Sequence, residues 1–357
     1  MKVRPFGGRS SDMDFSSDTS APAHPVIMHA LLEANQGAAP SYGADRWSAD
    51  ALEALRNVFE TDLEVWMTSS GTAANALGLS CVCPSTSLIL CHDEAHIERD
   101  ERGAPEFFTG GGRLSLLSGA HGRIGADVLQ ARLRLNRPEF VHETPAAVLS
   151  ISNLTECGTL YRPHEVRALA DLAHDAGLRV HLDGARFANA LVSADCSPAD
   201  LTWRAGVDVM SFGAGKNGAM GCEAILLFGE ARSLKGDLLT RAKRSGHMPP
   251  KMRFFSGQML AYLRDGLWLD LARHANASAQ ALSQALLGFP DAELAHPVDG
   301  NEVFVRLPQD AADRLSAAGA RFYPWPDGAF RFVCSWATRP DEIEAVRVIA
   351  SALRAGR

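Results

Sequence analysis

Short apolar stretches alternate with amphipathic stretches through the first two-thirds of the chain. Apolar runs bounded by turn residues are typical of buried strands, and apolar residues spaced three and four apart are typical of helices. We predict strands at residues 63–68, 87–91, 113–117, 147–152, 179–183, 208–213 and 223–228, and helices at residues 72–79, 126–135 and 163–177. This alternation predicts an α/β fold with a mostly parallel sheet between helices, in which ligands bind beyond the carboxyl ends of the strands.

The two ends of the chain differ from this middle part. Polar residues up to position 25 predict an extended arm, followed by a helix from about Ile27 that Gly37 ends and a second helix that begins near Ser48. In the last third we predict a long helix at 256–287, strands at 302–307, 321–323 and 330–335, and helices at 310–318 and 340–353. The predicted parts are an arm (1–25), a large domain (26–255) and a small C-terminal α/β domain (256–357).

Composition narrows the functional classes. Of the 357 residues, 46% are hydrophobic and 22% are charged, which is typical of a globular protein, and the net charge is −7. An acidic chain with no long apolar run gives no reason to expect a nucleic-acid or membrane partner. The seven cysteines are an odd number and lie mostly in apolar stretches, so we predict reduced thiols in a cytoplasmic protein. Cys81 and Cys83 lack a second pair at zinc spacing, and no metal site is predicted.

Two predicted strand ends carry the most informative chemistry. One strand runs from Arg179 into Asp183, and another runs from Asp208 into a glycine-rich turn that holds Lys216. Strands often end in polar residues, so either residue alone is weak evidence of function. Together they match what pyridoxal 5′-phosphate needs: a lysine to form a Schiff base with its aldehyde, and an aspartate to keep its ring nitrogen protonated.

A third segment supplies a phosphate site. Ser70, Gly71 and Thr72 follow a predicted strand and open a helix, where small residues and free backbone N–H groups favour an anion. The same pattern also occurs as an ordinary helix cap. A nucleotide-binding P-loop at Lys216 is the alternative, but Met210 stands in place of its first glycine and Asn217 in place of its serine or threonine.

At these residues the chain resembles the low-specificity threonine aldolases, and especially their phenylserine aldolase branch, among the fold-type-I pyridoxal phosphate enzymes. The segments that carry the resemblance lie at residues 15–19, 41–45, 70–72, 103–108, 181–190, 211–218, 251–254 and 330–333. It implies a fold-type-I transferase-like fold and cleavage of L-β-hydroxy-α-amino acids to glycine and an aldehyde. It also implies a homo-oligomer, expected to be a dimer of dimers, with the active site at a dimer interface.

The resemblance implies roles for four residues around the cofactor. Lys216 would hold the Schiff base and move protons, and Asp183 would pair with the ring nitrogen. His96 would stack on the ring, and Arg186 would lie beside the phenolic oxygen and the substrate carboxylate. From the residues alone, an ordinary polar loop residue is the alternative for His96, and a cap at a strand–helix junction is the alternative for Arg186.

Four further residues are implied in substrate and cofactor binding. Arg331 and Ser17 would hold the substrate carboxylate, for which a guanidinium group is well shaped. Tyr42 and Arg253 would reach the substrate and the cofactor across the dimer interface. Without the resemblance, Arg331 reads as a solvent-facing strand residue and Arg253 as part of a basic surface, while Ser17 and Tyr42 rest on the resemblance alone.

One segment departs from the family. Other threonine aldolases have a histidine within the stretch at residues 152–157, where this chain has Thr155 and Glu156. The group that takes the proton of the substrate hydroxyl is therefore open between His96, a water molecule and Glu156. We predict that bulky aryl substrates such as phenylserine are accepted at least as well as threonine. A β-eliminating lyase or an aminotransferase uses the same aspartate and lysine and is the alternative function.

Overall fold

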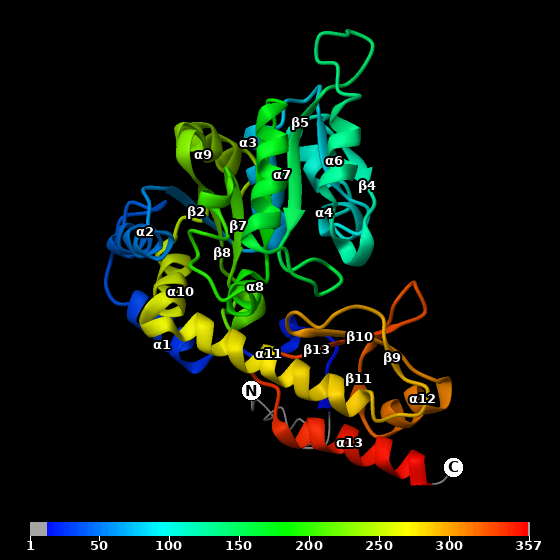
Figure 1. The fold of residues 1–357 in the computed structure, drawn as a ribbon. Helices are drawn as coiled ribbons and strands as arrows, with labels where there is room; N and C mark the ends of the chain where they lie inside the picture. Colours follow the sequence, from blue (N-terminus) through cyan, green and yellow to red (C-terminus); the bar gives the residue numbers. More distant parts are fainter. Residues whose placement is uncertain (1–12, 356–357) are drawn as a thin grey trace.

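A seven-stranded sheet forms the centre of the computed structural model, which describes residues 13–355 (Figure 1). Its strands, in spatial order, are β2 (Glu64–Thr68), β8 (Glu223–Leu227), β7 (Val209–Gly213), β6 (Arg179–Gly184), β5 (Ala146–Ser152), β3 (Leu88–His92) and β4 (Arg113–Leu117). The pairs from β7 to β4 are parallel, and only β8 runs antiparallel to its neighbours. This mostly parallel sheet confirms the predicted α/β class.

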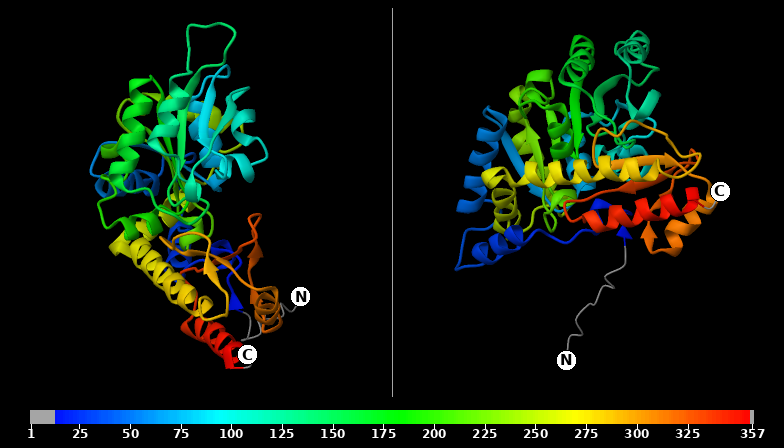
Figure 2. Two further views of the ribbon diagram at one scale, coloured as in Figure 1. Left: turned by 45° about the vertical axis from the view of Figure 1, so that its right-hand side comes forward. Right: turned by 60° about the horizontal axis from the view of Figure 1, so that its bottom comes forward.

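Helices cover both faces of this sheet (Figures 1 and 2). The helices of this part of the chain are α1 (Pro25–Ala34), α2 (Arg46–Phe59), α3 (Gly71–Val82), α4 (His96–Arg99), α5 (Ala104–Thr109), α6 (Ala126–Leu133), α7 (Pro163–Asp175), α8 (Phe187–Ala194) and α9 (Lys235–Arg244), of which α1 packs against a later helix below the sheet. Helix α3 lies close against β7 and β8 because Gly78 has no side chain there. A Cβ atom at Gly78 would lie 3.2 Å from Val209 Cγ1.

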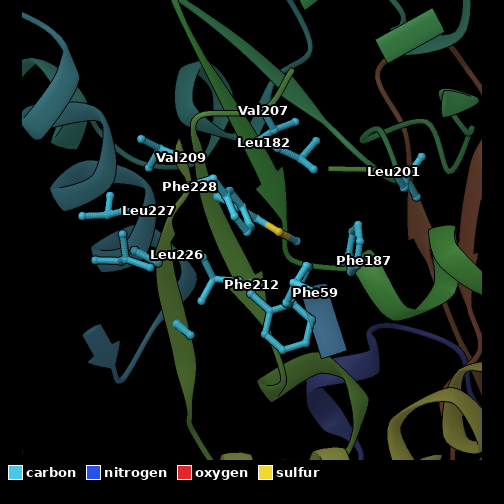
Figure 3. Close-up of a cluster of buried hydrophobic side chains, with 14 of the residues drawn as sticks. Phe59, Leu182, Phe187, Leu201, Val207, Val209, Phe212, Leu226, Leu227 and Phe228 are labelled. Atoms are coloured by element: carbon cyan, nitrogen blue, oxygen red, sulfur yellow. The ribbon is translucent and has the colours of Figure 1, made fainter. Parts of the chain in front are cut away.

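An aromatic cluster anchors the strand that leads to Lys216 (Figure 3). The ring of Phe212 on β7 packs edge-on against Phe59, with centroids 5.7 Å apart, and Phe59 stacks on Phe187 at 6.0 Å. All three side chains are fully buried. Burial of such side chains contributes about 2 kcal/mol each and fixes α2 and α8 against the sheet.

The C-terminal part has its own sheet and core. Helices α10 (Arg253–Leu263) and α11 (Leu267–Leu286) lead to β9 (Glu293–Leu294), β10 (Glu302–Arg306), α12 (Gln309–Ala317), β11 (Ala320–Arg321), β12 (Tyr323–Pro324), β13 (Phe330–Val333) and α13 (Pro340–Ala355). Strands β12, β13, β10 and β9 form an antiparallel sheet. Its hydrophobic cluster is separate from that of the large sheet and includes Phe15 from the predicted arm.

The described portion of the arm is a structural part of this C-terminal region. Strand β1 (Met13–Asp14) pairs with β11, and the N–H of Val333 donates to the carbonyl oxygen of Phe15 at 2.8 Å. Residues 1–12 of the predicted arm lie outside the described residues. No helix within residues 13–355 is long and apolar enough to span a membrane. The predicted domain boundaries stay a prediction.

Several predicted elements are wrong in detail. Helix α2 starts before Ser48 because Asp45 is its cap, with Asp45 Oδ1 accepting the Ser48 N–H at 2.9 Å. Helix α1 ends at Ala34, ahead of Gly37. The long helix predicted at 256–287 is two helices, because Asp265 and Gly266 adopt left-handed backbone angles.

The strand predicted at 321–323 is instead the two short strands β11 and β12, which belong to different sheets. The short helices α4, α5, α8 and α9 were not predicted. Two of them, α4 and α5, are no longer than six residues. Helices this short show too few turns for a periodic pattern.

Candidate active site

A cavity of about 430 Å³ lies at the carboxyl ends of β5, β6 and β7. The sequence-predicted residues Ser70, Gly71, Thr72, His96, Asp183, Arg186 and Lys216 all line it. Strand ends far apart in sequence meet here because parallel strands present their carboxyl ends at one edge of the sheet. The structure therefore brings together the three segments on which the cofactor prediction depends.

Asp183 ends β6 as a buried carboxylate with two hydrogen bonds. Its Oδ2 accepts from Asn75 Nδ2 at 2.7 Å, and its Oδ1 accepts from the Ala185 N–H at 3.0 Å. Burial alone would raise the pKa of Asp183, but the charge on His96 and the Ala185 N–H outweigh it and lower that pKa. An ionised carboxylate at this position can keep a pyridine nitrogen protonated.

Lys216 lies in a short 3₁₀ helix, Gly215–Asn217, that follows β7. The turn is held on both sides of the lysine. Glu223 accepts the N–H groups of Ala214 and Gly215 at 3.1 and 3.2 Å, while Asn217 Nδ2 donates to Tyr262 Oη at 2.9 Å. Burial raises the pKa of Glu223 to about 7. These contacts fix the backbone from which the lysine side chain enters the cavity.

The first turn of α3 contributes an anion site. Ser70 is the N-cap of this helix, and its Oγ accepts the Ala73 N–H at 3.2 Å. The helix-cap alternative is confirmed, and the same serine also lines the cavity, while its phosphate role stays a prediction. With Gly71 and Thr72, it places the amino end of a twelve-residue helix at the cavity wall, where the helix dipole favours a phosphate.

His96 belongs to a buried hydrogen-bond network beside Asp183. His96 Nδ1 and Glu101 Oε1 are 2.8 Å apart, and Asn75 Nδ2 donates to the same Glu101 oxygen at 2.8 Å. One ligand atom each of His96, Glu101 and Asp183 lies within 4.8 Å of the others. The hydrogen bonds account for this proximity, and the absence of a metal site stays a prediction. The stacking role of His96 also stays a prediction.

Arg186 is already paired within the chain. Its Nε and Nη2 donate to Asp18 Oδ2 and Oδ1 at 2.7 and 3.2 Å, and its Nη1 lies 3.3 Å from Glu302 Oε2. All three side chains are almost fully buried. Burial raises the pKa of Glu302, whereas the Arg186 charge and hydrogen bonds lower the pKa of Asp18 despite its burial. The arm therefore reaches the edge of the active site through Asp18.

The predicted pair of arginines for the substrate carboxylate is not assembled here. Arg331 is not among the described residues that line the cavity. Its Nη2 donates to the Ser16 carbonyl oxygen at 3.4 Å, and its guanidinium group lies 5.1 Å from the Trp325 ring centroid. The solvent-facing alternative is wrong, because Arg331 is partly buried. Ser17 caps the 3₁₀ helix Asp18–Ser20 and is also outside the lining. Their substrate roles stay predictions.

Tyr42 and Arg253 lie away from the cavity of their own chain. Arg253 Nη1 donates to the Gly37 carbonyl oxygen at 2.9 Å, and the Tyr42 side chain is 48% exposed under Lys243 Nζ, which is 4.8 Å from its ring centroid. Neither residue is among those described as lining the cavity. Roles for them in catalysis require a second copy of the chain, which stays a prediction.

Sequence reasoning missed several residues of the site. Asn75, Glu101, Asp18, Glu223 and Glu302 hold the predicted residues in place. Glu223 and Glu302 are each the first residue of a mostly apolar strand, which is the one local signal that marks them. Asn75 and Glu101 carry no such signal.

The polar groups that line this cavity fit pyridoxal phosphate. An ionised buried carboxylate, a lysine and a helix amino terminus line one cavity, and each matches one part of that molecule. Fold and site together define an α/β enzyme of fold type I that depends on pyridoxal phosphate.

Comparisons with known proteins agree. A family model described as β-eliminating lyase matches residues 14–309. The low-specificity L-threonine aldolases of Pseudomonas aeruginosa and of another Pseudomonas are both 41% identical to this chain, covering 95% and 96% of it and 96% and 97% of their own lengths. A threonine aldolase structure from Leishmania major matches with a TM-score of 0.86 and 27% identity, covering 96% of this chain and 98% of that one. The chain belongs to the β-eliminating lyase family, in the group of the low-specificity L-threonine aldolases.

Proposed function

We propose that this enzyme cleaves the Cα–Cβ bond of L-threonine and related β-hydroxy-α-amino acids, releasing glycine and an aldehyde. The observation that carries this proposal is the likeness, over nearly the whole chain, to two enzymes named low-specificity L-threonine aldolase. The ionised Asp183 and the lysine in one cavity supply the chemistry that such a cleavage needs.

Each of the residues that line the cavity has a different task in this proposal. Bound pyridoxal phosphate supplies an electron sink for the bond that breaks at Cα. Asp183 holds a proton on the ring nitrogen, the first turn of α3 binds the phosphate, and Lys216 anchors the cofactor and moves protons. Arg186, held by Asp18, places positive charge where the substrate carboxylate binds and so orients the Cα–Cβ bond.

A β-elimination is the second candidate, favoured by the description of the matching family model. The two reactions differ in their products. An aldolase yields glycine and an aldehyde, whereas elimination or transamination yields ammonia or a keto acid. Product analysis with L-threonine, L-allo-threonine and L-phenylserine separates them. Release of ammonia or a keto acid in place of glycine would refute the aldolase proposal.

Lys216→Ala is the variant that tests the cofactor bond. We expect it to lose the visible absorbance of the lysine-bound cofactor and nearly all turnover, because the described residues that line the cavity then include no lysine to form the Schiff base. Absorbance spectra before and after borohydride reduction measure this directly. Lys235→Ala is the control, since Lys235 pairs with Glu64 on β2, outside the cavity lining.

The finer substrate preference belongs to the same proposal. Leu154, Ala219 and Met220 give the cavity an apolar side that suits an aryl group, although Phe107 and Phe108 are not among the described lining residues. Burial of an aryl ring contributes about 1–2 kcal/mol, so kcat/KM should be about tenfold higher for phenylserine than for threonine. Specificity constants measured in one assay decide this, and a clear preference for threonine would contradict it.

We also propose a homo-oligomer, with a dimer of dimers as the expected state, and a cytoplasmic location. The dimer would bring Tyr42 and Arg253 to the neighbouring active site. The cytoplasmic location is supported by the seven cysteines, all of which are free thiols.

A further inference from the structure

Glu156 is a carboxylic acid of the cavity that the proposed function leaves without a role. It follows β5 in the loop that begins next to Asp183, because Ser152 on β5 pairs in register with Asp183 on β6. Leu154 and Glu156 line the cavity, whereas Thr155 is fully buried and donates from Oγ1 to the His121 carbonyl oxygen at 3.2 Å. Of Thr155 and Glu156, only Glu156 faces the cavity.

The Glu156 carboxylate is held in position by hydrogen bonds to one of its oxygens. Oε1 accepts the backbone N–H of His96 at 2.7 Å and the Ser152 hydroxyl at 2.9 Å. Within the described residues, both of these hydrogen bonds are donated to Oε1. They fix the orientation of the carboxylate without involving Oε2. Burial and the charge of Asp183 together raise the pKa of Glu156 to about 7, so the group exchanges a proton readily near neutral pH.

His96, the other candidate base, has a different state. Burial lowers the pKa of His96, but the hydrogen bond with Glu101 and the charge of Asp183 outweigh this and raise it. Glu101 engages His96 Nδ1 at 2.8 Å, so this ring nitrogen is not free to accept the substrate proton. His96 is thus tied to Glu101 at the cavity wall, an arrangement that suits a residue lying against the cofactor.

We propose that Glu156 is the catalytic base that accepts the proton of the substrate β-hydroxyl group during Cα–Cβ cleavage. The proposal rests on the proposed aldolase function. The proton passes to Oε2 of Glu156, and the electron pair of the O–H bond becomes the second bond of the aldehyde carbonyl. The Cα–Cβ bond breaks with its electron pair on Cα, and a proton delivered there completes glycine. One proton leaves the substrate and one returns, so no other reactant is needed.

Glu156→Gln is the central test, because glutamine keeps an acceptor for the His96 N–H and the Ser152 hydroxyl but cannot take a proton. We expect kcat for phenylserine cleavage to fall at least about 100-fold. Exchange of the glycine α-hydrogen with solvent deuterium, followed by NMR, should change less than about threefold, since it uses the same cofactor site without a hydroxyl group. The dissociation constant of pyridoxal phosphate from the apo-enzyme should also be unchanged.

Parallel loss of cleavage, exchange and cofactor binding would show a structural role and overturn the proposal, as would cleavage at the wild-type rate. Glu94→Gln is the matched control, because Glu94 lies nearby and pairs with Arg99 outside the cavity lining. If the wild-type enzyme releases no glycine, the aldolase proposal fails instead, and the two failures are distinguished.

The pH profile supplies a second test that does not depend on Glu156→Gln folding. The charged groups facing Glu156 are Asp183 on β6, His96 on α4 and Arg186 before α8. Because the base must be ionised, kcat/KM should rise with pH through a value near 7. Ser152→Ala removes a hydrogen bond that stabilises the ionised form, so this limb should move to higher pH. If the rise of kcat/KM with pH is unchanged in Ser152→Ala and absent in His96→Gln, the base is His96, and the proposal is overturned.

Discussion

Asp183 shows how single side chains set the chemistry of this site. Its carboxylate stays ionised in a buried position because Asn75 and the Ala185 N–H donate to it and because the charge on His96 lies near it. Asn75 Nδ2 donates to both Asp183 and Glu101. The ionised state of Asp183 therefore depends on a small hydrogen-bond network of neutral and charged groups.

Asp183→Asn should therefore reduce kcat by about two to three orders of magnitude, because the ring nitrogen of the cofactor would no longer be held protonated. Steady-state kinetics measure this, with cofactor content determined in parallel. Asp208→Asn removes the same charge at the far edge of the sheet, where Asp208 binds Val180 N–H at 2.8 Å, and should lower stability with little effect on kcat. A loss below tenfold in Asp183→Asn would make Asp183 a structural residue.

The residues that the sequence predicted share a local signal. Asp183, Lys216 and Ser70 each stand where an apolar strand ends, and the parallel sheet brings such ends together. Asn75 could not be predicted because its partner Asp183 is 108 positions away. The pairing of Arg186 with Asp18 spans 168 positions and was missed for the same reason. Long-range pairs leave no periodic pattern in one sequence.

At the scale of elements, the arm contacts both the C-terminal region and the active-site cavity. Strand β1 pairs with β11, Phe15 packs against Phe332 with centroids 6.1 Å apart, and Asp18 pairs with Arg186 beside the cavity. Asn301 Nδ2 also donates to Asp18 Oδ2 at 3.0 Å. The arm is thus bound at Met13–Asp14, through β11, and again at Asp18, through Arg186 and Asn301.

Asp18→Asn should lower the free energy of unfolding by about 3 kcal/mol, because it leaves a buried guanidinium group with one charged partner fewer. The pKa of Asp18 is lowered in the folded state, so its contribution is complete above the ordinary pKa of about 4 and disappears as pH falls through the folded value. Denaturation at several pH values should show the variant and wild type converging in acid.

Asp14→Asn is the control for that measurement. Asp14 lies in the same arm but is partly exposed, and its bonds to Ser16 are local. Its loss should cost less than about 1 kcal/mol. Equal effects of the two substitutions would contradict a special role for the Asp18–Arg186 pair.

The pattern of apolar stretches predicted the parallel strands β3, β6 and β7 well because they are nearly fully buried and bounded by turn residues. It did not predict that β8 runs antiparallel, since direction depends on the connection between Gly213 and Glu223 and leaves no mark on the strand itself. The break between α10 and α11 was missed although Gly266 is a local signal for it, because apolar residues continue on both sides of Asp265 and Gly266.

At the scale of the whole molecule, exposed apolar side chains point to a covered face. Met28 and Leu32 on α1 are 43% and 69% exposed, and Met220 at the cavity is 62% exposed. Helix α1 packs against α10, which begins at Arg253. Exposed apolar residues therefore lie both at the cavity and on the helix that packs against α10, where Arg253 is predicted to act across an interface. A second copy of the chain would cover such residues.

Mixed dimers test whether Arg253 serves the active site of the partner. Lys216→Ala and Arg253→Ala should each be nearly inactive alone, whereas a hybrid would contain one site with both residues intact. Random reassociation of equal amounts should restore about a quarter of wild-type activity, because half of the dimers are hybrids with one working site. Separately tagged chains allow the hybrid to be isolated and assayed. Recovery of activity requires the two residues to act on one site from different chains. Hybrids as inactive as their parents would place Arg253 in the site of its own chain or in no site at all.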